Sequence, residues 1–102
     1  MLFLDEKLCV KRLTTLREGF RNTVAVPVRE ISELAFAEHS RTVVLAQNYP
    51  DCTCKPSPED IAVTRHLVKV LRDMQIDLID HIIVGSDGAC SLRENSAFLG
   101  LD

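Results

Sequence analysis

The chain has 102 residues, 46% of them apolar and 26% charged, which suits one compact domain with a single modest core over residues 1–102. Its formal net charge is −3 and its longest basic cluster is only Lys11-Arg12, which argues against binding nucleic acid by neutralising phosphates. No apolar run reaches the roughly 18 residues that a membrane-spanning helix needs, and Asp5-Glu6-Lys7 interrupts the apolar start of the chain, so we expect a cytoplasmic protein without a signal sequence.

The first half of the chain predicts two strands, a helix and a third strand. Leu2–Leu4 and Leu8–Leu16 are separated by a short polar connector, which is typical of an antiparallel hairpin. Apolar residues recur at helical spacing from Pro27 onward and predict a helix of about three turns. Thr42–Ala46 is apolar and rich in β-branched residues, which predicts a central strand covered on both faces.

The second half predicts a longer helix and a second hairpin. Ser57 suits an N-cap with Pro58 at the first helical position, and this helix should end near Gln75. Leu78–Val84 is the next expected strand, and a turn at 86–88 returns the chain through Ala89–Leu92 as its hairpin partner. Residues 95–101 are expected to add a short terminal helix. The resulting order ββαβαββ predicts an α/β domain with a mixed sheet flanked by helices.

One segment carries a recognisable motif spacing. Pro50, Ser57 and Asp60 fall where the RadC-type branch of the JAB/MPN (JAMM) metallopeptidase-like domains has His-x-His-Pro, six residues, and Ser-x-x-Asp. Gln47 and Tyr49 stand where that motif has its two histidines, and Asp51-Cys52 replaces the Ser-Gly that follows its proline. The segment therefore resembles a metal-hydrolase site without its imidazoles.

The resemblance extends from Leu2 to about Arg93. Its further matches are Arg29-Glu30-Ile31, Thr42–Ala46, Asp80–Gly85 and Ser91–Glu94, which are similar to a helix start, two strands and a following segment of the family. The resemblance implies a JAB/MPN-like fold, which is also described as cytidine-deaminase-like. A bacterial RadC-type protein normally carries a helix-hairpin-helix region ahead of this domain, and we expect none here, because Met1 leads directly into a strand.

The family resemblance also implies a zinc hydrolase chemistry that these residues support poorly. A JAMM site uses two histidines and an aspartate as zinc ligands, a glutamate as general base, and a serine that assists the oxyanion. Carried over by spacing, Asp60 keeps the carboxylate, Ser57 keeps the hydroxyl of the catalytic serine, and Gln47 and Tyr49 are weak ligands. The position of the base falls on Thr14 or Thr15, with Glu18 the nearest carboxylate. We therefore expect a degenerate site that binds no cofactor.

Two local alternatives stay open. Ser57 and Asp60 also fit a capping box, which needs no metal. Cys52 and Cys54 could instead join Asp60 and His81 in a different zinc site, or one of them could act as a nucleophile beside Lys55 or His81.

The four cysteines are expected to be free thiols in a reducing compartment. Cys9 and Cys90 lie in strand-like runs and are interpreted as small core residues.

Three functions follow as hypotheses. The first is a non-catalytic binding or scaffolding module that self-associates or binds a protein partner, as JAB/MPN domains commonly do. The second is a zinc-dependent peptidase or isopeptidase that uses Asp60, Cys52 and Cys54 as substitute ligands. The third and weakest is nucleic-acid binding, suggested by the DNA-repair association of the RadC name, which the acidic composition disfavours.

Overall fold

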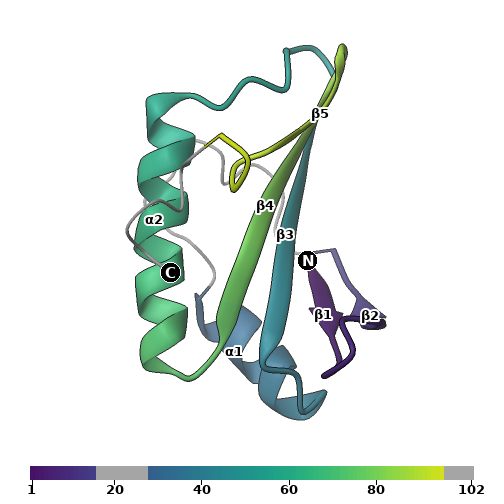
Figure 1. Ribbon diagram of the computed structural model, residues 1–102, viewed down its shortest axis with the longest axis vertical. Coiled ribbons are helices and arrows are strands. Elements are labelled where there is room, and N and C mark those ends of the chain that lie inside the picture. The colour runs from purple at the N-terminus through teal and green to yellow at the C-terminus, as the bar shows by residue number, and fades with distance from the viewer. Residues whose placement is uncertain (16–27, 96–102) are drawn as a thin grey trace.

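In the described part of the chain, a five-stranded mixed sheet packs with two helices (Figure 1). The computed structural model describes residues 1–15 and 28–95, and the strands lie in the order β2-β1-β3-β4-β5. The elements are β1 Leu2–Leu4, β2 Val10–Leu13, α1 Val28–Ala37, β3 Thr42–Tyr49, α2 Pro58–Asp73, β4 Asp77–Gly85 and β5 Gly88–Ser91. The predicted order ββαβαββ and the mixed α/β class are confirmed.

The N-terminal hairpin forms because its connector closes on itself. One carboxylate oxygen of Asp5 accepts hydrogen bonds from the backbone N–H groups of Lys7 and Cys9, at 2.8 and 2.9 Å. β1 pairs antiparallel with β2 on one side and with β3 on the other. β2 is therefore an edge strand, and it is shorter than predicted, since it ends at Leu13. Cys9 lies in the connector and is exposed, so its interpretation as a core residue is wrong.

Both helices follow the predicted periodicity. α1 buries Ile31 and Ala35, and α2 buries Leu67, Val68 and Leu71 against the sheet. α2 ends two residues before the predicted position, and Gln75 with a φ of 63° turns the chain toward β4. Among the described residues no helix has the length and apolar character to cross a membrane.

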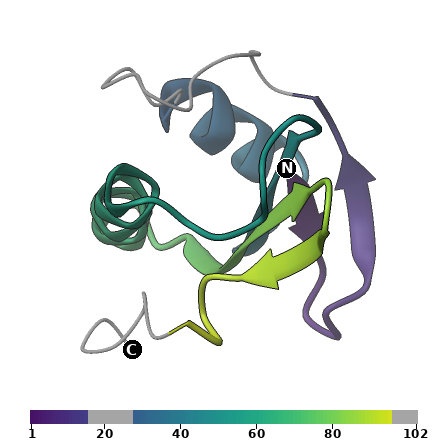
Figure 2. The same cartoon turned by 90° about the horizontal axis from the view of Figure 1, so that it is seen from above.

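The two central strands expose one face of the sheet. β3 and β4 pair in parallel over the whole of β3. Val43, Leu45 and Ile83 are completely or almost completely buried, whereas Ala46 and Val84 on the opposite face are exposed. Figure 2 shows α1 and α2 on the same side of the sheet. The prediction that Thr42–Ala46 is covered on both faces is thus wrong, because both helices pack on the same face.

The second hairpin closes the sheet at its other edge. β4 pairs antiparallel with β5, and Gly88 takes a φ of 134°, which few side chains tolerate. Asn95 lies in a turn, and the rest of the predicted terminal helix lies outside the described residues, as does Pro27.

Candidate functional site

The motif residues meet where the carboxyl ends of β3 and β4 approach the start of α2. Gln47 and Tyr49 are two residues apart on β3 and therefore point to the same side of the sheet. That side faces α2, where Asp60 lies in the first turn and is only 3% exposed. The motif spacing thus correctly predicts that these side chains cluster.

These side chains form a continuous hydrogen-bonded series, which we call the polar chain: Asp60, Tyr49, Gln47, His81 and Thr64. The Tyr49 hydroxyl lies 2.9 Å from Gln47 Oε1 and 3.3 Å from Asp60 Oδ1. Gln47 Oε1 also lies 2.7 Å from His81 Nε2. The second ring nitrogen, Nδ1, lies 2.6 Å from Thr64 Oγ1. The polar chain therefore links β3, β4 and α2 through side chains alone.

The partners of His81 determine its protonation. Gln47 Oε1 can only accept, so His81 Nε2 carries the proton and Nδ1 accepts from the Thr64 hydroxyl. The ring is 2% exposed, and burial lowers the pKa of His81 from 6.5 to about 4, although the negative charges of Asp60 and Asp80 oppose this shift. The imidazole is thus neutral at pH 7, and both of its nitrogens are occupied by hydrogen bonds.

Asp60 also caps α2. Its Oδ2 accepts from the Ser57 backbone N–H at 2.8 Å, and the Ser57 hydroxyl accepts from the Asp60 backbone N–H at 3.1 Å. This is the reciprocal capping box that the sequence offered as an alternative. The Ser57 N–H therefore donates to one carboxylate oxygen of Asp60, and the other lies beside the Tyr49 hydroxyl, whose single proton is shared with Gln47 Oε1.

The residues at the motif positions do not fit a zinc ion. Zinc sites in hydrolases use imidazole nitrogens, carboxylate oxygens or thiolates, and three such ligands leave a position for water. An amide oxygen and a phenol replace two of them here, and the remaining carboxylate already accepts from the Ser57 N–H and lies against the Tyr49 hydroxyl. Within residues 1–15 and 28–95 there is no group of three or more His, Cys, Asp or Glu side chains placed to hold a metal.

A disulfide joins two of the four cysteines. Cys54 and Cys90 form a disulfide, so the expectation of four free thiols is wrong for this pair. While it is bonded to Cys90, the Cys54 sulfur is not a thiolate ligand, and the substitute zinc site with Cys52, Cys54 and Asp60 stays a prediction. Cys90 is only half-buried, although it packs against the core as expected.

The position of the general base gives no carboxylate in the described residues. Thr14 exchanges backbone hydrogen bonds with Met1, at 3.0 and 3.1 Å, next to the N-terminal hairpin. Glu18 lies outside the described residues.

Sequence reasoning missed two members of the polar chain. Thr64 lies one helical turn after Asp60, on a face of α2 that is otherwise apolar, and this i, i+4 pair of buried polar residues was a usable signal. His81 is hydrogen-bonded at both ring nitrogens, to Thr64 and to Gln47. Its contact with Gln47 depends on the parallel register of β3 and β4, which no local pattern encodes.

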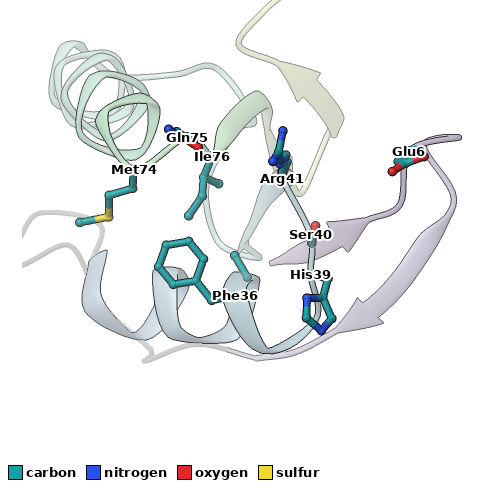
Figure 3. Close-up of a pocket in the computed structure, with 9 residues that line it drawn as sticks. Glu6, Phe36, His39, Ser40, Arg41, Met74, Gln75 and Ile76 are labelled. Atoms are coloured by element: carbon teal, nitrogen blue, oxygen red, sulfur yellow. The ribbon is translucent and has the colours of Figure 1, made fainter.

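A cavity of about 610 Å³ lies at the opposite end of the sheet, where both helices end (Figure 3). Phe36, Met74 and Ile76 line it together with Arg41. None of its lining residues belongs to the polar chain. The motif residues therefore form a filled, hydrogen-bonded cluster that is separate from this cavity.

Known proteins similar to this chain point to one family. Residues 1–97 match the family described as RadC-like JAB domain. The chain is 36% identical over 93 residues to a UPF0758 protein of Chloroflexus aggregans, which covers 91% of this chain and 41% of that protein. It is 38% identical over 86 residues to a UPF0758 protein of Neisseria meningitidis serogroup B, covering 81% of this chain and 38% of the relative. The chain spans about two fifths of the length of these curated relatives. From the match over residues 1–97, together with the mixed sheet and the motif spacing, this chain belongs to the RadC-like JAB domain family.

Proposed function

We propose that this domain is a non-catalytic member of its family that acts by binding, as a self-associating scaffold. The polar chain is the observation that carries the proposal. Gln47, Tyr49, Asp60 and His81 are hydrogen-bonded to one another at the motif positions, which leaves no ligand set for a catalytic metal.

A metal ion at the motif positions would have to displace existing hydrogen bonds of Asp60. Binding at this place would break the contacts of Asp60 with Tyr49 and with the Ser57 backbone, and would leave buried donors without acceptors. The amide oxygen of Gln47 and the phenol of Tyr49 are weak zinc ligands, so their bonds to the metal would compensate little for this loss. In the part of the chain that the structure describes, the motif positions thus lack the ligands for a metal that would lower the pKa of a water toward neutrality, as zinc-dependent hydrolysis requires.

The surface best suited to self-association is the outer edge of β2. Among the described residues β2 pairs only with β1, so its outer edge presents unpaired backbone groups there, and Leu8, Val10 and Leu13 in and next to β2 are 57 to 71% exposed. The two basic side chains of β2 contact Glu38 of the same domain. Arg12 forms an ion pair with the Glu38 carboxylate at 3.0 Å, and Lys11 donates to the Glu38 carbonyl. Charge repulsion between two β2 strands is thereby reduced, and their apolar side chains remain available to a second copy.

Hydrolysis assays test the non-catalytic part. The wild-type domain is incubated with peptide and isopeptide substrates in the presence of excess zinc, alongside Asp60→Asn. We expect equal background rates for the two proteins. Turnover that a chelator abolishes and that Asp60→Asn lacks would overturn the proposal.

Light scattering after size exclusion tests the scaffold part. We expect the molar mass of the wild type to rise with concentration, and Val10→Thr/Leu13→Thr to remain monomeric while keeping β-branched residues in the strand. Val84→Thr, which alters an exposed apolar residue of β4, is the matched control and should associate like the wild type. A wild type that is monomeric at every concentration, or a double variant that associates equally, contradicts the role of β2.

A further inference from the structure

The disulfide joins the motif loop to the opposite hairpin. We call residues 50–57, between β3 and α2, the motif loop, because they separate Tyr49 from Asp60. Cys54 in this loop is bonded to Cys90 in β5, with 5.5 Å between the two Cα atoms and 36 residues of sequence separation. This Cα distance lies within the usual range for disulfides. Neither cysteine belongs to the polar chain.

Other contacts hold the same two segments together. The Cys54 backbone N–H donates to Asp87 Oδ1 at 2.9 Å, and the Ser86 N–H donates to the Cys52 carbonyl at 2.8 Å. Gly85 lies directly against the loop, because a Cβ at this residue would come within 2.4 Å of the Cys54 nitrogen. The two sulfurs therefore stay close to each other when the bond between them is open, and its closure is an intramolecular reaction between groups that are already in place.

The two cysteines differ in exposure. Cys54 is 7% exposed and belongs to the hydrophobic core, whereas Cys90 is half-buried on β5, the other edge strand of the sheet. Because Cys90 is the more exposed of the two residues, an incoming thiolate should reach Cys90 more readily than Cys54. Access of this kind decides which sulfur of a disulfide is attacked.

We propose that Cys54 and Cys90 form a thiol–disulfide exchange site, at which thiols and disulfides of the glutathione class open and close the bond between the motif loop and β5. This site is independent of the proposed scaffold function, because β2 lies at the other edge of the sheet. Disulfides that occur in reducing compartments are usually transient and redox-sensing, which fits a bond with one accessible sulfur.

The exchange proceeds in two balanced steps. A glutathione thiolate attacks Cys90 Sγ, the bond to Cys54 breaks, and its electron pair leaves on Cys54 Sγ, which takes a proton from water. A second glutathione thiolate then attacks the mixed disulfide and releases glutathione disulfide and the Cys90 thiolate. Two glutathione thiols are oxidised and the protein disulfide is reduced to two thiols. The reverse sequence restores the bond.

Opening the Cys54–Cys90 bond should loosen the end of the domain that contains the motif loop and the start of α2. The motif loop ends at Ser57, whose backbone N–H donates to Asp60 Oδ2. The loop therefore positions the first turn of α2 and, through the contact of Asp60 with Tyr49, the polar chain. In the reduced form the loop keeps its hydrogen bonds to Ser86 and Asp87 but loses its covalent link. The start of α2 should therefore exchange its amide hydrogens faster, while β1 and β2 should not change.

The first experiment uses the full chain in glutathione buffers that range from fully oxidised to fully reduced. Alkylation of thiols followed by peptide mass spectrometry reports the Cys54–Cys90 bond, and hydrogen–deuterium exchange reports residues 50–60. We expect the bond to open and reform reversibly, with faster exchange in the reduced form confined to that end of the domain. Cys9→Ser, which removes an exposed thiol of the N-terminal hairpin, should behave like the wild type.

Single variants test the predicted asymmetry. In oxidised glutathione, Cys54→Ser should accumulate about tenfold more mixed disulfide at Cys90 than Cys90→Ser accumulates at Cys54, because Cys90 is the more exposed residue. Circular dichroism of both variants verifies that they are folded. A Cys54–Cys90 bond that stays closed in fully reduced glutathione, a bond that never forms in the oxidised buffer, or equal modification of the two variants would each overturn the proposal.

Discussion

The side-chain oxygen of Gln47 accepts from both His81 and Tyr49, so it holds two polar side chains in place at the motif positions. The scaffold around them still follows the motif, since Tyr49 reaches Asp60 and Ser57 caps α2. Gln47→His/Tyr49→His should therefore create a zinc site with Asp60, with about one ion per chain. Calorimetric titration with zinc measures it, and Gln47→His/Tyr49→His/Asp60→Ala is the control that should lose it. A folded double variant without affinity for zinc would show that the backbone no longer matches the family's geometry.

His81 should make the domain sensitive to acid. Its pKa in the folded protein is about 4, below the ordinary value of 6.5, so the unfolded chain binds the proton more readily. The contribution of His81 to the free energy of unfolding is fully present above pH 6.5. It is lost as the pH falls from 6.5 to about 4, by up to about 3 kcal/mol. NMR titration of the ring protons gives the pKa directly, and urea unfolding at several pH values gives the loss, with His66→Gln on the exposed face of α2 as control. A pKa near 6.5 for His81 in the folded state would contradict this assignment.

At the level of residues, the sequence predicted the members of the site that one motif contains. Gln47, Tyr49, Ser57 and Asp60 are close in sequence, and a strand followed by a capped helix brings them together. His81 joins them only through the parallel register of β3 with β4. The Cys54–Cys90 bond has the same origin, because its partners are 36 residues apart and nothing local distinguishes them from Cys9 and Cys52.

At the scale of elements, the approach of the motif loop to β4 depends on the missing side chain of Gly85. A Cβ there would lie 2.4 to 2.7 Å from backbone atoms of residues 52–54, and backbone cannot yield as a flexible side chain does. Gly85→Ala should lower the free energy of unfolding by about 1 to 3 kcal/mol. Urea denaturation measures the change, and Val84→Ala at the exposed neighbouring position is the control. Stability equal to that of the wild type would mean that the loop is displaced without cost.

Element types were easier to predict than element surroundings. Apolar periodicity and the Ser57 cap located both helices, and the run at Thr42 located β3. β3 nevertheless continues to Tyr49, because pairing with β4 keeps the polar motif residues extended. The exposure of Ala46 could not be predicted either, since an apolar strand is compatible with one covered face or with two.

At the scale of the whole molecule, the polar chain, the cavity and the exposed apolar side chains of the N-terminal hairpin lie in three different parts of the sheet. The polar chain lies at the carboxyl ends of β3 and β4, the cavity at their opposite ends, and the exposed apolar side chains of the N-terminal hairpin along the β2 edge. A change at the motif positions should therefore leave association through β2 unaffected. The proposed association through β2 therefore does not depend on the residues at the motif positions.

Zinc content is the measurement that tests the central claim most directly. The wild-type domain is equilibrated with excess zinc, passed through a desalting column and analysed by elemental mass spectrometry. We predict no retained zinc, because the polar chain occupies the donor atoms at the motif positions. One zinc ion retained per chain, and lost in Asp60→Ala, would contradict the account.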